Sequence, residues 1–292
     1  MMTETIGIKL AEGGCAEVFE WGISGKKIVK LAKPNTDLIS LQNEMHHTHV
    51  AWELGLPVPR VYELVEAESR NGIVFERING DSLLERFVRA IMEQQEEPTA
   101  GEETDEFGDI HSTADLLHLV HTHTARNMDM PDQRQRIKRD IWCVPYLEDS
   151  EKTAVTALLD QLPPKHALCH GDPNPGNILL ADGRLVLIDW NDATVGNPEA
   201  DLAEYVVMMR YAVLPASVPE SVKLVFHEFR EKVIREFMAE YEKKSGITYA
   251  DIVPWLVPIA ARKLSADSLC EEERSLLISE IRSKLKLLNS TV

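Results

Sequence analysis

Three side chains in one short segment have the types and the spacing for phosphate chemistry. Asp172 and Asn177 lie five residues apart in a loop rich in Pro and Gly, directly before an apolar run. Asp189 follows a second apolar run, and Asp182-Gly183 between the two runs is the strongest hairpin signal in the chain. Because a hairpin brings its two ends together, we expect Asn177 and Asp189 to lie close to each other.

An amide and a carboxylate side by side offer the oxygen ligands that Mg²⁺ prefers. The pair Asn177 and Asp189 therefore predicts a divalent-metal site, and Asp172 supplies a further carboxylate nearby. Phosphoryl transfer needs these parts, because the metal neutralises the phosphates while a carboxylate orients the attacking hydroxyl. Taken alone, residues 172–177 are also typical of a simple turn, since each residue type in them favours turns.

The elements that must position these residues change character along the chain of 292 residues, a length that suits one large domain or two ordinary ones. The first 78 residues predict three strands, a helix and two further strands. The strands are expected at residues 6–10, 16–21, 26–31, 60–66 and 73–77, with a turn at 69–72 and the helix from an N-cap at 35–37 to about 54.

The rest of the chain predicts mainly helices. They are expected at residues 82–93, 113–126, 198–211, 219–243, 249–264 and 268–288. A small β region between residues 167 and 188 interrupts them and contains the hairpin. Strands followed by helices indicate an α+β fold.

The motif H-G-D-x-x-x-x-N from His170 to Asn177, followed by I-D-W at residues 188–190, resembles the aminoglycoside phosphotransferase family. Two further segments, G-N-P at 196–198 and D-L-A at 201–203, also resemble a family motif, and Leu117-His118 matches its helical L-H. The resemblance implies a bilobal protein-kinase-like fold. Its parts are a small antiparallel-sheet N-lobe with one helix (residues 1–78), which binds nucleotide, and a larger, mainly helical catalytic and acceptor-binding C-lobe (79–292).

The resemblance also implies roles for individual residues. Asp172 would be the catalytic aspartate that accepts the proton of the acceptor hydroxyl, and Asn177 and Asp189 would hold Mg²⁺ against the triphosphate. Lys30 would hold the α and β phosphates and pair with Glu44. From the residues alone, Lys30 alternates with Ile28 on one face of its strand, but an isolated lysine or glutamate is more typical of a solvated surface.

The remaining nucleotide-binding residues carry weaker signals. Gly13 and Gly14 lie in a turn between two strands, where backbone N–H groups would face phosphates, although only Gly13 matches the kinase glycine pattern. Glu76 and Ile78 fall at the hinge that would contact adenine through its backbone. His170 is expected to brace the catalytic loop.

The net charge of −17, from 48 acidic and 31 basic residues, disfavours nucleic-acid and anionic-membrane partners, because phosphate binding needs clustered Lys and Arg. It would attract a cationic small molecule, although solubility is the simpler explanation. Residues 93–109 hold eight acidic residues and no basic one, which predicts a mobile solvated loop or an insertion. We expect this loop to flank the acceptor site.

Other features argue against competing classes of site. The four cysteines form no C-x-x-C pair, no apolar run reaches the ~18 residues of a membrane span, and no signal sequence precedes the first strand. We therefore expect a cytoplasmic protein.

The histidine clusters at 46–49 and 118–123 lack a convergent third ligand, so we expect no histidine metal site. Trp142, Trp190, Trp255, Tyr205 and Tyr211 are expected in the core, as is Cys169.

These observations predict a Mg²⁺-dependent phosphotransferase with an alcohol group as acceptor. It would move the γ-phosphoryl of ATP or GTP to a hydroxyl of an aminoglycoside-like or other small molecule. A kinase for choline, homoserine or a sugar is an alternative, because relatives acting on these acceptors share the loop. A nucleotide-binding regulator that has lost catalysis and a metal-dependent hydrolase are further alternatives, and the oligomeric state stays open.

Overall fold

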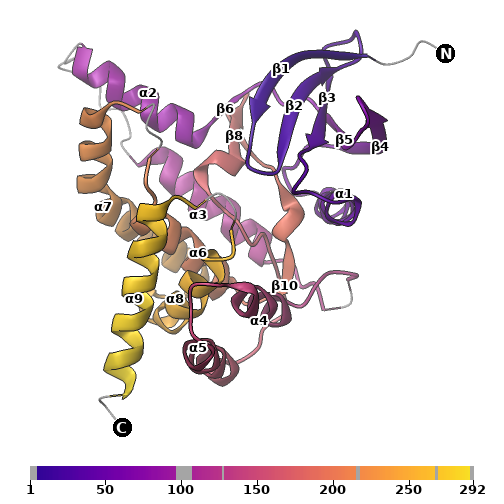
Figure 1. Cartoon of the computed structure of the whole chain (residues 1–292). Coiled ribbons are helices and arrows are strands. Elements are labelled where there is room, and N and C mark those ends of the chain that lie inside the picture. Colours follow the sequence, from indigo (N-terminus) through magenta and orange to yellow (C-terminus); the bar gives the residue numbers. More distant parts are fainter. Residues whose placement is uncertain (1–4, 97–106, 127, 215–217, 267–268, 290–292) are drawn as a thin grey trace. The chain divides into compact units, whose positions relative to one another are not determined.

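The computed structural model describes residues 5–96, 107–126, 128–214, 218–266 and 269–289 (Figure 1). The chain forms two compact units, of which unit 1 comprises Met1–Leu83 with Pro175–Ala193 and unit 2 comprises Leu84–Asn174 with Thr194–Val292. The lobe boundary after residue 78 that the resemblance implies stays a prediction. Within the described residues, no helix combines the length and the apolar character that crossing a membrane requires.

Unit 1 is built on a five-stranded sheet with the order β1-β2-β3-β5-β4, in which every neighbouring pair is antiparallel (Figure 1). Its strands are β1 (Ile6–Glu12), β2 (Ala16–Trp21), β3 (Lys27–Ala32), β4 (Val61–Ala67) and β5 (Arg70–Glu76). A second sheet in unit 1 has the order β6-β8-β9 and consists of β6 (Asp81–Ser82), β8 (Ile178–Ala181) and β9 (Arg184–Leu187). All five strands predicted for the N-terminal region are therefore present.

One helix, α1 (Leu38–Glu53), packs on one face of the large sheet. It begins at Asp37, whose side chain accepts a hydrogen bond from the backbone of Ser40, as the predicted cap requires. Leu41 of α1 joins a cluster with Ile73 and Phe75 of β5. Strand residues that alternate with these form a second buried cluster: Trp21, Val29, Leu31 and Val74. The sheet thus carries a separate buried cluster on each side.

The turn between β4 and β5 differs from the prediction. The chain reverses at Glu68 and Ser69, which have φ of +51° and +59°, and β5 already begins at Arg70. Gly72 therefore lies inside a strand, where a Cβ atom would come within 2.7 Å of Leu31 Cδ2. The sequence signal of this glycine reflects close strand packing and not the turn itself.

Unit 2 is mainly helical. Its helices are α2 (Leu83–Glu96, of which Leu83 belongs to unit 1), α3 (Gly108–His121), α4 (Gln133–Cys143), α5 (Asp149–Gln161), α6 (Pro198–Tyr211), α7 (Glu220–Ser245), α8 (Tyr249–Lys263) and α9 (Glu271–Asn289). A two-stranded antiparallel sheet joins β7 (Ala167–Cys169) to β10 (Thr194–Gly196). An antiparallel-sheet region with a mainly helical remainder is the predicted α+β class.

Several sequence expectations for unit 2 need correction. α4 and α5 were not predicted, because the sequence of α4 is dominated by charged and amide side chains and offers only Ile137 and Ile141 as a buried apolar stripe. α3 begins and ends five residues earlier than expected. The predicted acidic loop 93–109 is shortened, since 93–96 belong to α2 and 108–109 to α3, while 97–106 lie outside the described residues.

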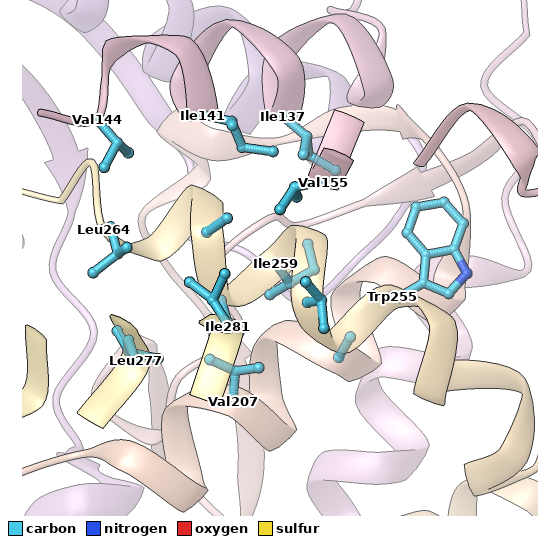
Figure 2. Packing of buried hydrophobic residues seen from close by; sticks show 14 of the residues in the cluster. Ile137, Ile141, Val144, Val155, Val207, Trp255, Ile259, Leu264, Leu277 and Ile281 are labelled. Carbon is cyan, nitrogen blue, oxygen red and sulfur yellow. The ribbon is translucent and has the colours of Figure 1, made fainter. Parts of the chain in front are cut away.

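The core of unit 2 surrounds α8. Figure 2 shows buried side chains of α4, α5, α6 and α9 gathered around it, with Trp255, Ile259 and Leu264 contributed by α8 and its cap. Trp255 is 2% exposed, so its predicted place in the core is confirmed. Trp142 is 48% exposed and was wrongly assigned to the core. The packing fixes the backbone of α8 up to its C-terminal end.

Candidate active site

The hairpin in unit 1 places two predicted metal ligands at one end. Its turn uses Asp182 and Gly183 with φ of +49° and +74°, the backbone that a tight hairpin requires. At the open end, the backbone N of Ile188 donates to O of Asn177 at 2.9 Å. Asp189 is the next residue and adopts the left-handed region with φ of +63°. Asn177 and Asp189 therefore lie at the same end of the hairpin.

Lys30 lies on the face of the large sheet that α1 covers. β3 pairs on both sides, with Lys30 opposite Val18 and Ile73. Alternation along β3 places it on the side of Ile28 and Ala32, which pack in the cluster with α1. The shared face of Lys30 and Ile28 that the sequence predicted is thus observed, and the lysine side chain is only 16% exposed.

Two carboxylates meet the Lys30 ammonium. Its Nζ lies 2.7 Å from Oε1 of Glu44 and 3.0 Å from Oδ1 of Asp189. Burial opposes the charge of Lys30, but the Asp189 and Glu44 carboxylates outweigh it and raise its pKa. Burial raises the pKa of Glu44, which is packed into α1, and the Lys30 ammonium opposes that shift. Two acidic groups therefore share one cation.

The loop that carries Asp172 belongs to unit 2 and follows β7. Asp201 of α6 accepts hydrogen bonds from two consecutive loop amides, His170 N at 2.6 Å and Gly171 N at 2.9 Å. Gly171 has φ of +84°, which favours glycine. Its carbonyl accepts a hydrogen bond from Arg262 of α8 at 2.9 Å. Helices α6 and α8 together hold the backbone that presents Asp172.

Asp172 is engaged by its own loop. Its backbone N donates to Nδ1 of His170 at 3.3 Å, so the buried histidine contacts the loop that it was expected to brace. Its Oδ2 accepts a hydrogen bond from Nδ2 of Asn174 at 2.9 Å. The side chain as a whole is 31% exposed, whereas its Oδ1 atom is buried.

The predicted site residues divide between the two units. Lys30 contacts both Glu44 and Asp189 in unit 1, and Asn177 lies at the hairpin end in the same unit. Asp172 lies in unit 2. The motif from His170 to Asn177 therefore begins in one unit and ends in the other.

The predicted phosphate turn is tied down by its neighbours. Gly13 N donates to O of Ala16 at 2.9 Å, and Nζ of Lys33 donates to O of Gly13 at 2.7 Å. Nδ2 of Asn35 donates to O of Gly14 at 3.4 Å. The N–H of Gly13 is thus used inside the turn between β1 and β2, although it was expected to face phosphates.

The predicted adenine-binding residues lie at and beyond the end of β5. Glu76 closes the strand, its backbone N donates to O of Arg60 at 2.8 Å, and its Oε2 accepts from N of Arg60 at 3.1 Å. Ile78 follows in the irregular segment after the strand and is half-buried. Both residues remain candidates for the hinge.

The buried side chains of His121, Asp201 and Tyr241 form a polar cluster next to the Asp172 loop. His121 places Nε2 3.2 Å from Oδ2 of Asp201 and Nδ1 2.7 Å from the hydroxyl of Tyr241. Together with Cys169, these side chains bring three donor atoms within 4.8 Å of one another, so His121 does have convergent neighbours that its sequence spacing did not reveal. Burial raises the pKa of the Cys169 thiol, which keeps it protonated. Within this cluster, His121 connects Tyr241 to Asp201, and Asp201 holds the loop amides.

Two residues that hold the loop, Asp201 and Arg262, were not among the predicted site residues. Asp201 was part of the D-L-A motif, so the signal was present, but no role was assigned to it. Arg262 had no local signal, because it lies 91 residues from its partner Gly171. Only the packing of α8 brings it there.

A model of the phosphotransferase enzyme family matches residues 9–241 of the chain. Solved structures with a similar fold include a thermostable mutant of the aminoglycoside phosphotransferase APH(4)-Ia in its apo form, with 15% identity and a TM-score of 0.61 over 96% of this chain and 95% of that one. The aminoglycoside phosphotransferase APH(3'')-Id from Streptomyces rimosus has 16% identity and a TM-score of 0.55 over 87% and 92%. A macrolide 2'-phosphotransferase type I has 17% identity and a TM-score of 0.57 over 96% and 92%.

A search of curated proteins finds no match. At these identities the solved structures demonstrate a common fold, and they confirm the α+β, kinase-like class that the sequence predicted. The family match spans most of the chain and confirms the resemblance drawn from the His170–Asn177 motif. The chain belongs to the phosphotransferase enzyme family.

Proposed function

We propose that this phosphotransferase moves the γ-phosphoryl group of ATP or GTP to a hydroxyl group of a small molecule, with Mg²⁺ as its metal. The observation that carries the proposal is the Lys30 cluster, in which a largely buried ammonium is held by Glu44 and Asp189. A cation fixed in this way is suited to binding the α and β phosphates of a nucleotide. The domain division and the individual roles below are part of the proposal.

The residues at the hairpin end fit a magnesium ion. Asn177 and Asp189 offer amide and carboxylate oxygens, the hard donors that Mg²⁺ prefers. Asp189 is 41% exposed on its side chain and already shares one ammonium with Glu44, so a further cation would balance the local charge. When bound there, the metal neutralises charge on the phosphates. Lys30 orients the nucleotide, and Glu44 keeps Lys30 in place.

Asp172 acts on the hydroxyl group of the acceptor as a general base. Its loop is held by Asp201 and Arg262, and its side chain is 31% exposed. It accepts the proton of the acceptor hydroxyl as that oxygen forms a bond to phosphorus and the bond to the leaving nucleoside diphosphate breaks. Positioning and electrostatic stabilisation supply most of the rate in this type of reaction.

The acceptor is a small molecule with a hydroxyl group, and we favour a cationic one. The chain carries a net charge of −17, which would draw a cation by long-range attraction. The solved structures with the same fold carry the names of aminoglycoside and macrolide phosphotransferases, which gives a first panel of compounds. A metabolite kinase that acts on choline, homoserine or a sugar is the second candidate, because the motif does not distinguish acceptors. The cytoplasm is the expected location.

A screen of acceptors tests the function. Purified protein is given Mg·ATP or Mg·GTP with kanamycin, hygromycin B, streptomycin, erythromycin, choline, homoserine or a sugar, and nucleoside diphosphate release is followed by a coupled assay. We expect one acceptor class to accelerate release and to yield a phosphorylated product by mass spectrometry. Phosphate release that no acceptor alters would favour the hydrolase, and Mg·ATP binding without any turnover would favour the inactive regulator.

A further inference from the structure

Two consecutive cations lie at the C-terminal end of α8, close to the loop that carries Asp172. They are Arg262 and Lys263, and the dipole of the helix favours positive charge at this end. Their backbone is held in the core of unit 2, since the neighbours Ala261 and Leu264 are 0% and 2% exposed. Figure 2 shows Leu264 in this core. Both long side chains therefore start from a rigid position.

Arg262 fixes the loop backbone and a buried carboxylate at the same time. One of its guanidinium nitrogens lies 2.9 Å from O of Gly171 and 2.9 Å from Oε2 of Glu204. Its Nε also lies 3.6 Å from Oδ2 of Asp140, a carboxylate that accepts from Arg139 at 2.9 Å. Glu204 is only 2% exposed and comes from α6. Arg262 thus sets the position of Glu204 relative to the loop.

Lys263 lies between the Glu204 carboxylate and the Asp172 carboxylate. Its Nζ lies 3.3 Å from Oε1 of Glu204 and 4.0 Å from Oδ1 of Asp172, and its side chain is 17% exposed. Burial opposes its charge, but the Glu204 and Asp172 carboxylates outweigh this and raise the pKa of Lys263. The ammonium therefore stays charged beside Asp172.

The loop itself supplies no positive charge. Residues 170–177 read H-G-D-P-N-P-G-N and contain neither lysine nor arginine. A carboxylate that accepts a proton from a hydroxyl must be ionised and held in one orientation. Within unit 2, α8 provides the cation Lys263 beside Asp172, although the two residues lie 91 positions apart in the chain.

We propose that Lys263 is a positioning residue for phosphoryl transfer. Its ammonium holds the Asp172 carboxylate in one orientation, and Glu204 and Arg262 hold the lysine in turn. This inference rests on the proposed function, because it assigns Lys263 an effect on the step that Asp172 performs.

Kinetics of lysine variants test the inference. ADP release from Mg·ATP is measured with water as the acceptor, so that the result does not depend on the acceptor screen. We expect Lys263→Met to lower kcat by about 100-fold, a loss typical of removing one preorganised charge, and to change the KM for ATP by less than about threefold. Lys263→Arg should restore kcat to within about tenfold of the wild type, because it keeps the charge. If Lys263→Met does not fold, Lys263→Gln replaces it.

Lys152 provides a matched control. It is also a largely buried lysine of unit 2, and its Nζ lies 3.8 Å from Oδ1 of Asp149 and near the Trp142 ring. Lys152→Met should keep the wild-type kcat. A similar loss of kcat in this control would mean that any buried lysine acts through stability, and the inference would fail.

A double-mutant cycle separates this inference from the proposed function. Free energies of unfolding in urea are compared for Lys263→Met, Asp172→Asn and the double variant, and we expect non-additivity because the two groups interact directly. Equal ADP release by the wild type and Asp172→Asn would overturn the proposed function. Loss of turnover in Asp172→Asn together with normal kcat in Lys263→Met, or an additive cycle, would overturn the inference alone.

Discussion

Two clusters of charged side chains, one in each unit, differ in the number of cations that they contain. In unit 1, the two acidic side chains Glu44 and Asp189 share the cation Lys30. In unit 2, Arg262 and Lys263 face Glu204, Asp172 and Asp140, and Asp140 also pairs with Arg136 and Arg139, so each carboxylate there has at least one cation beside it. The difference suggests that unit 1 is prepared for an additional cation, whereas the Asp172 loop is already neutralised by the protein itself.

The largest effect is expected from removing the catalytic carboxylate. Asp172→Ala should lower kcat by about 10⁴-fold, because a positioned general base contributes up to this factor. Its affinity for Mg·ATP, measured by calorimetry, should stay close to that of the wild type, since the Lys30 cluster is intact. Wild-type kcat in a correctly folded Asp172→Ala variant would contradict the role given to this loop.

Removing the proposed metal ligand Asp189 in unit 1 should cause a smaller loss of kcat, together with a change in the Mg²⁺ dependence of ATP binding. Asp189→Ala should lower kcat by about 10³-fold and should abolish the dependence of ATP binding on Mg²⁺, because a proposed ligand is missing. Chelating Mg²⁺ with EDTA should weaken ATP binding to the wild type and to Asp172→Ala, but should change little for Asp189→Ala. If ATP binding to Asp189→Ala still depended on Mg²⁺ as it does in the wild type, Asp189 would not be a metal ligand and the contrast between the charge clusters of the two units would lose its explanation.

Loss of the loop anchor should affect stability first. Asp201→Asn replaces a carboxylate that accepts from two backbone amides with a group that has one accepting oxygen, which should cost about 1–3 kcal/mol in the free energy of unfolding. Urea denaturation measures this cost. Asp115→Asn, which changes a half-exposed carboxylate paired with Lys244 in the same unit, should change stability by about 0.5 kcal/mol or less. Equal losses in both variants would show that Asp201 has no special role.

The smallest of these effects concerns the partner of Lys30. Glu44→Gln keeps the shape of the side chain but removes its charge, so we expect the KM for ATP to rise by about tenfold with little change in kcat. Glu53→Gln is the matched control, because it alters an exposed glutamate on the same helix. A change confined to kcat would place Glu44 in the chemical step and not in nucleotide binding.

Much of the fold followed from local patterns. The strands β2 and β3, the Asp37 cap of α1 and the Asp182-Gly183 turn each depend on residues close in the chain, and all of them were predicted. The β4–β5 turn was misplaced because Gly72 serves strand packing. α4 was missed because its stability comes from burying two isoleucines against other helices, which its own sequence barely signals.

By itself, the sequence determined the family, the hairpin and the identity of Lys30, Glu44, Asn177, Asp189 and Asp172 as candidates, since motif spacing and local backbone preferences are written in neighbouring residues. Tertiary structure alone decided how the Asp172 loop is held. Asp201, Arg262 and Lys263 reach it from α6 and α8, and no local pattern encodes a contact between side chains that lie 30 to 91 residues apart. Such contacts exist because the cores of the helices bury together and fix where their ends meet.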